Sequence, residues 1–199
     1  MTSASTPWHD DLERKPAPGP LICVQALVNT VERPDGADRL AEPDEARRWL
    51  VDNNLLTPNA DLNPADLDLV RDVRESLRAL LVQNAGGPAP SEAELAALRQ
   101  VAAHGFARAE FGEDGEVRLA AVGYSVRDRL VELLLTIRDA QRDGSWLRLK
   151  ACGNTECRWA FYDRSRNRGG TWCEMSACGN KLKNRDFRAR RRQAVPGQP

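Results

Sequence analysis

The sequence predicts a mainly helical fold with a small β-hairpin, an α+β chain in which a helical N-terminal domain is followed by a compact C-terminal module. Apolar residues recur at helical spacing through most of the chain, and four of the five cysteines lie in the last quarter. Charge also divides the chain. Residues 1–143 carry 16 Lys and Arg against 25 Asp and Glu, whereas residues 144–199 carry 13 against 4. The first part is therefore net −9 and the second net +9, although the formal net charge is zero.

The helical part begins with an apolar segment, residues 21–31, whose length fits a buried helix or a strand equally well. Pro43 and the two acids after it open a short helix over residues 43–51, because proline is tolerated in a first turn and acids suit the positive end of the helix dipole. Asn63 precedes a longer helix, residues 64–81, whose apolar side chains follow a 3.6-residue repeat.

The second half of the helical part contains the expected hairpin. Ser91 and Glu94 have the spacing of a capping box and start another helix. Residues 106–111 and 117–122 flank the sequence Gly-Glu-Asp-Gly, which is typical of a β-hairpin. Apolar residues at helical spacing over residues 126–137 predict the last helix of this part.

These patterns divide the chain into four parts. We expect a disordered N-terminus over residues 1–20, a helical domain over 21–144, a small module over 145–193 and a disordered tail over 194–199. Because the helical stripes can pack against one another, we expect the helical domain to have a core of its own and to fold without the module.

The cysteines of the module form two pairs with the same spacing, Cys152 with Cys157 and Cys173 with Cys178. Two such pairs can place four thiolates around one zinc ion, which requires tetrahedral ligands at about 2.3 Å. The alternative is two disulfides. It is disfavoured because residues 1–20 lack the apolar core of a signal peptide and no run is long enough to span a membrane. We therefore expect a cytoplasmic protein with reduced thiols and one structural zinc.

Catalysis is not expected. Four cysteine ligands leave zinc no open coordination position, and neither Cys23 nor the two histidines belong to a recognisable catalytic motif. The alternative is an enzyme with its active site in a pocket of the helical domain, but no sequence motif supports it.

The module has the expected order of a treble-clef-like zinc finger. Residues 152–157 form a knuckle in which Gly153 permits a positive φ, and the bulky residues 159–162 predict a strand. A polar turn over residues 163–170 leads back to the second cysteine pair, giving a hairpin, and residues 178–193 have the composition of a helix.

Basic residues of the module predict contact with a polyanion. They lie on the polar turn and along the expected helix: Arg164, Arg166, Arg168, Lys181, Lys183, Arg185, Arg188, Arg190 and Arg192. Because arginine can meet phosphate with two parallel hydrogen bonds, the pattern indicates binding to double-stranded DNA. The alternatives are a solvated basic tail and an adaptor that binds RNA or an acidic protein partner.

Residues 152–190 resemble the CGNR zinc finger. The resemblance rests on the first cysteine pair, on Trp-Ala-Phe at 159–161, on Tyr-Asp-Arg-Ser-Arg-Asn at 162–167 and on Trp-Cys-x-Met-x-x-Cys-Gly-Asn-Lys-x-Lys at 172–183. The apolar segment at residues 21–30 is similar to the opening motif of the ABATE domain, which commonly precedes that finger.

The resemblance implies a regulator of transcription that binds DNA through the finger. We also expect the acidic helical domain to sense a small-molecule ligand or to form a homodimer. Two positions depart from the family pattern. Lys181 stands where the motif has arginine, and Gly169, Gly170 and Thr171 stand where arginines usually precede Trp172.

Overall fold

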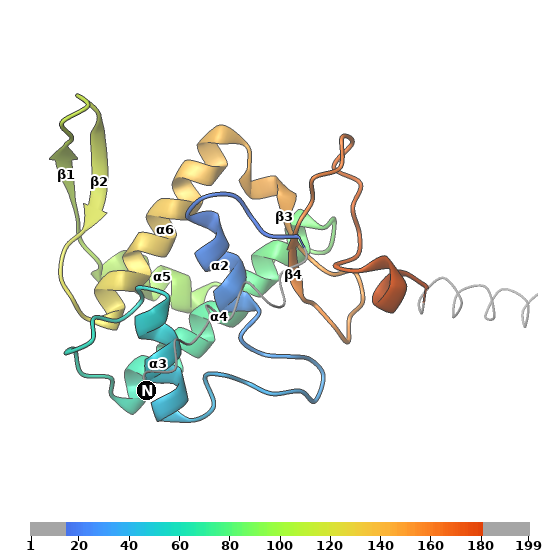
Figure 1. Ribbon diagram of the computed structural model, residues 1–199, viewed down its shortest axis with the longest axis horizontal. Coiled ribbons are helices and arrows are strands. Elements are labelled where there is room, and N and C mark those ends of the chain that lie inside the picture. The colour runs from blue at the N-terminus through green and yellow to red at the C-terminus, as the bar shows by residue number, and fades with distance from the viewer. Residues whose placement is uncertain (1–14, 181–199) are drawn as a thin grey trace, which may run out of the picture.

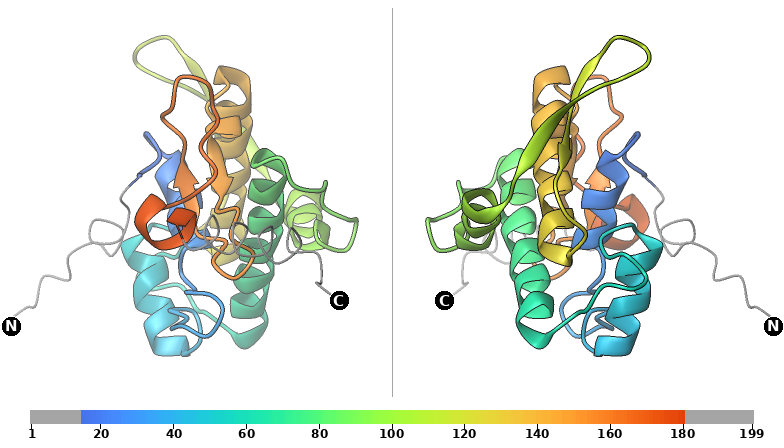
Figure 2. Two further views of the ribbon diagram at one scale, coloured as in Figure 1. Left: turned by 90° about the vertical axis from the view of Figure 1, so that its right-hand side faces the viewer. Right: turned by 90° about the vertical axis from the view of Figure 1, so that its left-hand side faces the viewer.

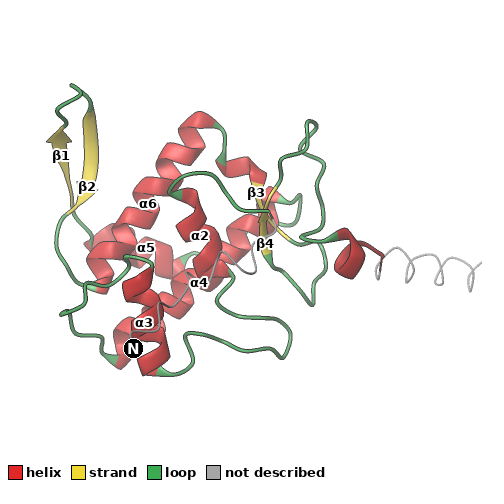
Figure 3. Cartoon of the chain, viewed as in Figure 1, coloured by secondary structure: helices red, strands yellow, loops and turns green. Residues whose placement is uncertain are grey.

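A computed structural model describes residues 15–180 of the chain (Figure 1). Within this range five α-helices occur, namely α2 (Leu21–Val28), α3 (Pro43–Asp52), α4 (Pro64–Asn84), α5 (Ala96–His104) and α6 (Val126–Asp143). The strands form two antiparallel ribbons, β1 (Ala107–Phe111) with β2 (Val117–Ala121), and β3 (Leu149–Ala151) with β4 (Ala160–Tyr162) (Figure 3). A 3₁₀ turn, Trp146–Arg148, precedes β3, and a π-helical turn, Met175–Gly179, follows the second ribbon. The predicted α+β fold class is confirmed.

Several helix ends follow from local sequence. The Asn63 side chain accepts a hydrogen bond from the Asp66 N–H at the start of α4. Ser125 and Asp128 form a capping box before α6, which ends at Gly144 with φ 78°. The bonds expected between Ser91 and Glu94 are present, but they close a turn over residues 92–95 that leads into α5, which begins at Ala96. No helix among residues 15–180 is long and apolar enough to cross a membrane.

The open choice for residues 21–31 is decided in favour of helix α2. This helix contacts α4, α6 and β4, and most of its side chains are buried. A helix surrounded by protein needs no polar face, which explains why its sequence lacks the alternation that would have identified it.

One cluster of buried side chains runs through both halves of the chain. Leu149 and Ala160 of the second ribbon are fully buried in the same cluster as Leu27 of α2 and Leu77 of α4. Figure 2 shows the second ribbon and the following loops lying against α2 and α4. The helical domain and the module therefore do not have separate cores, which argues against the expectation that the helical domain folds without the module.

The N-terminal segment also joins this core. We expected residues 1–20 to be disordered, but residues 15–20 make defined contacts. The Tyr162 N–H donates to the Lys15 carbonyl at 2.9 Å, the Ala17 N–H donates to Gln25 Oε1 at 2.7 Å, and Ala17 is buried. The sequence missed these contacts because a polar, proline-rich stretch has no periodicity, although its backbone can still pair with a strand. Residues 1–14 and 181–199 lie outside the described part of the chain.

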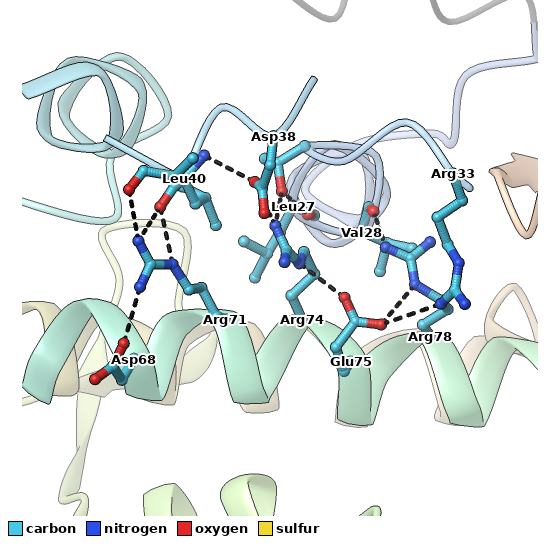
Figure 4. A network of polar contacts seen from close by, with 12 residues as sticks. Leu27, Val28, Arg33, Asp38, Leu40, Asp68, Arg71, Arg74, Glu75 and Arg78 are labelled. Atoms are coloured by element: carbon cyan, nitrogen blue, oxygen red, sulfur yellow. Dashed lines mark hydrogen bonds and ion pairs between the residues drawn. The ribbon is translucent and has the colours of Figure 1, made fainter. Parts of the chain in front are cut away.

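Arginines one turn apart on α4 hold the loop between α2 and α3 (Figure 4). Arg74 donates to Asp38 Oδ1 at 2.7 Å, and Arg78 donates to the Val28 carbonyl at 2.7 Å. Burial opposes ionisation of Asp38, but the hydrogen bonds from Arg74 and the Leu40 N–H together with the positive charges of Arg74 and Arg71 outweigh it, and they lower the pKa of Asp38. The loop is therefore attached to α4 through charged groups.

Candidate metal centre and nucleic-acid interface

The four C-terminal cysteines lie together at the edge of the second ribbon. Their sulfur atoms are all within 4.8 Å of one another. Cys157 Sγ is 3.7 Å from Cys173 Sγ, which is 3.9 Å from Cys178 Sγ. Four sulfurs at about 2.3 Å from a tetrahedral zinc ion stand about 3.8 Å apart, so this donor set fits zinc. All four cysteines are free thiols, and these separations exceed a disulfide bond of about 2.05 Å.

Strand pairing brings the first two cysteines together. Cys152 follows β3 and Cys157 precedes β4, and the Cys152 N–H donates to the Trp159 carbonyl at 2.9 Å. The Gly153 N–H then donates to the Thr171 carbonyl at 2.8 Å, which ties the knuckle to the segment before the second pair.

Three details of the expected module differ. Strand β4 pairs with β3, which lies before the knuckle, and residues 171–173 form no strand. Gly153 is not among the glycines with positive φ. A side chain there would instead bring its Cβ within 2.9 Å of Thr171 Cγ2. Finally, the helical turn that carries Cys178 is π-helical and begins at Met175, before this ligand, while the part of the expected helix after residue 180 lies outside the described residues.

Electrostatics within the cluster favour a bound cation. The hydrogen bond from Cys157 lowers the pKa of Cys152 to about 2, and the same contact raises the pKa of Cys157 to about 12. Hydrogen bonds to Cys152 and Cys157 also raise the pKa of Cys173. Crowded thiols share protons because neighbouring thiolates repel one another, and a divalent cation replaces those protons.

Asn154 is a residue of the site that the sequence analysis did not identify. Its amide Nδ2 donates to Cys178 Sγ at 3.8 Å, and its side chain is buried. A donor aimed at a ligating sulfur orients the ligand and stabilises its thiolate. The only feature of the sequence that could have identified Asn154 is its position two residues after Cys152, within the knuckle.

Two buried amides, Gln25 in α2 and Asn29 at its C-terminal end, connect this helix to β4, the strand that follows the first cysteine pair. Asn29 Nδ2 donates to the Ala160 carbonyl at 2.9 Å, and the Ala160 N–H donates to Asn29 Oδ1 at 2.7 Å. Gln25 Nε2 donates to the same carbonyl at 3.2 Å. Asn29 and Gln25 are fully buried, so water cannot replace these bonds.

The predicted arginines of the polar turn are exposed. Arg164, Arg166 and Arg168 all have exposed side chains. Arg164 Nη2 donates to the Pro16 carbonyl at 3.0 Å, whereas no hydrogen bond joins the side chains of Arg166 and Arg168 to any residue between 15 and 180. The other predicted basic residues, from Lys181 to Arg192, lie outside the described residues.

A buried ion pair shapes this turn. Lys150 Nζ lies 2.8 Å from Asp163 Oδ2, and both side chains are buried. Asp163 also accepts hydrogen bonds from the N–H groups of Ser165 at 3.0 Å and Gly170 at 2.7 Å. Burial opposes its ionisation, but the hydrogen bonds from Lys150 and the turn outweigh this and hold the pKa of Asp163 well below its usual range. A Cβ at Gly170 would meet the Asp163 carboxylate at 2.7 Å, so glycine is required there.

A cleft of about 730 Å³ lies between α4, α5 and the knuckle. Its charged lining includes Glu75 and Arg78 from α4, Glu94 from the turn before α5, and Arg33 and Arg158. Because Arg158 follows Cys157 directly, one wall of the cleft belongs to the metal centre.

The comparisons with known proteins agree with this arrangement. Residues 148–191 match the CGNR zinc finger. Residues 23–142 match ABATE, a family described as "Putative stress-induced transcription regulator". No curated protein matches the chain. The finger match and the four-sulfur geometry together give the chain one structural zinc site. Since the second match covers more than half of the chain, the protein belongs to the ABATE family and carries a CGNR zinc finger.

Proposed function

We propose that this regulator binds double-stranded DNA through the zinc finger. The observation that carries the proposal is the turn over residues 163–170 of the finger, which presents three exposed arginines on a backbone braced by the ion pair of Lys150 with Asp163. A braced turn loses little conformational entropy when it meets DNA, and guanidinium groups suit phosphate oxygens.

In this proposal Cys152, Cys157, Cys173 and Cys178 are the zinc ligands. The bound ion supplies positive charge and cross-links the knuckle to the second cysteine pair. Zinc acts structurally, because four thiolates complete its tetrahedron. Reduced thiols are required, which favours a cytoplasmic protein.

The basic residues after the π-helical turn add to the same interface: Lys181, Lys183, Arg185, Arg188, Arg190 and Arg192. Under this proposal residues 145–193 act as the DNA-binding unit and residues 21–144 as the regulatory unit, although the two share a core. Phosphate contacts dominate affinity for DNA, and each one contributes about 0.9 to the slope of log K against log salt.

Salt-dependent binding to duplex DNA tests the proposal. Replacing Arg166 and Arg168 with Gln should weaken binding and reduce the slope by up to about 1.8, if each contacts one phosphate. The control is Arg142→Gln, an exposed arginine at the end of α6, which should leave the slope unchanged. Zinc-loaded protein that ignores duplex DNA but binds RNA or an acidic protein would support the adaptor instead.

We also propose that the cleft takes a small-molecule ligand, because it has walls from both the helices and the knuckle. A ligand there would contact Arg158 and could alter the finger directly. The test is a thermal-shift screen of metabolites on the zinc-loaded protein. Ala93→Trp, a change at an exposed residue that lines the cleft, should abolish the shift from a true ligand. A shift that persists in this variant places the ligand elsewhere.

A further inference from the structure

The ribbon of β1 and β2 projects from the molecule (Figures 1 and 2), and several of its apolar side chains are exposed. Phe111 is 77% exposed and Val117 is 66% exposed. A two-stranded hairpin by itself is marginally stable in water, and a larger sheet or a packed face is normally needed. The ribbon therefore has the properties of a surface that pairs with something else.

One face of this ribbon is entirely apolar. The register pairs Ala107 with Ala121, Ala109 with Leu119 and Phe111 with Val117. Because side chains alternate along a strand, these pairs share one face. The other face carries charge. Arg108 and Glu110 lie there, and Arg108 Nη2 is 2.8 Å from Glu110 Oε1.

The two outer edges of the ribbon differ in whether their backbone groups are free to pair with another strand. The Val122 N–H donates to the Phe106 carbonyl, and the Gly112 N–H donates to the Glu116 carbonyl. Hydrogen-bonded positions alternate along an antiparallel strand, so Arg108 and Glu110 are the residues of β1 whose backbone groups bond to β2. The backbone groups of the alternate residues on β1, namely Ala107, Ala109 and Phe111, therefore face outward. The ribbon has only two strands among residues 15–180, so in that range the outer edge of β1 is unpaired.

The outer edge of β2 is partly covered. The Ala121 N–H, which faces away from β1, donates to Glu132 Oε1 of α6 at 2.9 Å. Helix α6 also packs beside β2, whereas β1 is the strand farther from the helices (Figure 1). The edge open to a further strand is therefore the edge of β1.

The sequence of β1 is complementary to itself. If a second copy pairs antiparallel about Ala109, Ala109 faces Ala109, and Ala107 faces Phe111 at hydrogen-bonded positions. Arg108 then faces Glu110 of the second copy twice, at the non-hydrogen-bonded positions where side chains approach most closely. The large Phe111 lies opposite the small Ala107, and the apolar faces of both ribbons become continuous.

We propose that two copies of this chain associate through β1, forming a four-stranded antiparallel sheet centred on Ala109. The pairing satisfies the outward backbone groups of both β1 strands, sets two ion pairs across the interface, and does not depend on DNA binding. Such a dimer would carry two zinc fingers, one from each chain.

Charge exchange tests this pairing without loss of the hairpin. In Arg108→Glu, two carboxylates face each other across the interface at each 108–110 pair. In Glu110→Arg, two guanidinium groups face each other at the same positions. Each single variant should therefore be monomeric at concentrations where the parent is dimeric. The double exchange restores opposite charges and should restore the dimer. An equimolar mixture of the two single variants should form the heterodimer, since every facing pair is then opposite in charge.

Sedimentation equilibrium without DNA, over about a hundredfold range of concentration, provides the measurement. Ala109→Pro should prevent dimerisation, because it removes an outward N–H of β1. Leu119→Pro is the matched control, because it removes an outward N–H of β2 and should leave the dimer intact. Helical circular dichroism monitors folding of each variant. A parent protein that stays monomeric at every concentration overturns the proposal, as does a dimer that survives the single exchanges or that the mixture fails to restore.

Discussion

The two antiparallel ribbons have opposite surroundings (Figure 3). The first has five-residue strands, and every residue of β1 is exposed. The second has three-residue strands, and all of their residues are buried. The shorter ribbon lies against α2 and α4 and carries a cysteine at each end of its loop, whereas the longer one extends into solvent. Strand length therefore does not determine burial here, and the packing of neighbouring helices does.

This contrast assigns the ribbons different roles. The second ribbon connects the metal centre to the helical core, so damage to it should unfold the protein. The first contributes little to the core of a single chain, so damage to it should alter association and leave the fold intact. Matched substitutions in the two ribbons can separate these roles.

The largest contrast is expected between two phenylalanines. Phe161 is 2% exposed and Phe111 is 77% exposed. Phe161→Ala should lower the free energy of unfolding by about 3–5 kcal/mol, because it leaves a cavity. Phe111→Ala should change it by less than about 0.5 kcal/mol in the monomer. Urea unfolding of dilute protein measures both, and equal costs would remove the distinction between the ribbons.

The buried ion pair beside the second ribbon should have a comparable effect. Asp163→Asn leaves the Lys150 ammonium buried without a counter-charge, which costs about 3–5 kcal/mol. We expect the lower end of this range, because the single carbonyl oxygen of asparagine still accepts one of the two hydrogen bonds from the turn. The double change Lys150→Met with Asp163→Asn should recover part of the loss, because it removes the unpaired ammonium and keeps an acceptor for the turn. If Asp163→Asn is as stable as the parent, the pair does not hold the turn.

The amide of Asn29 tests the connection between α2 and β4. Asn29→Ala leaves the N–H of Ala160 buried and unpaired, at a cost of about 2–3 kcal/mol. Asn53→Ala is the control, because its side chain bonds only to Trp49 within the same helix and should cost about 1 kcal/mol. Chelators should also remove zinc more easily from the Asn29 variant than from the Asn53 variant. Equal zinc retention would mean that the metal centre is independent of α2.

The smallest effect concerns acid stability away from the ribbons. The pKa of Asp38 is lowered in the folded protein, so its contact with Arg74 stabilises the fold above its unfolded pKa of about 3.9. That stability is lost as pH falls through the lowered folded value. The difference in unfolding free energy between the parent and Asp38→Asn should therefore be largest near neutral pH and should shrink toward zero in acid. Zinc loss affects both proteins alike, and a difference that stays constant with pH would contradict this account.

The cysteine cluster and the first hairpin could be predicted from sequence because both depend on local spacing. Cys152 and Cys157 are five positions apart, and two glycines bound the hairpin turn. The shared core could not be predicted in this way. Asn29 and Ala160 are 131 positions apart, and a buried asparagine in an apolar segment does not identify its partner.

The sequence also did not predict which segments are exposed to solvent. Residues 106–111 and 117–122 alternate in the manner of a half-buried ribbon, yet on the apolar face only Ala121, next to α6, packs against the core, while Phe111 and Val117 are exposed. Conversely, Lys15 lies in a proline-rich stretch with no pattern, and its Nζ donates to the Trp172 carbonyl at 2.7 Å. Both outcomes depend on tertiary packing, which local periodicity does not report.

Removal of zinc is the most direct test that the metal centre and the helices form one folding unit. Thermal unfolding of the full chain would be followed by the helical circular dichroism signal, with bound zinc and after chelation under reducing conditions. Because the second ribbon connects the cysteines to the buried core, we predict a single cooperative transition with zinc and a helical transition at clearly lower temperature without it. Helices that melt at the same temperature in both states would contradict the account and show that the helical domain is stable by itself.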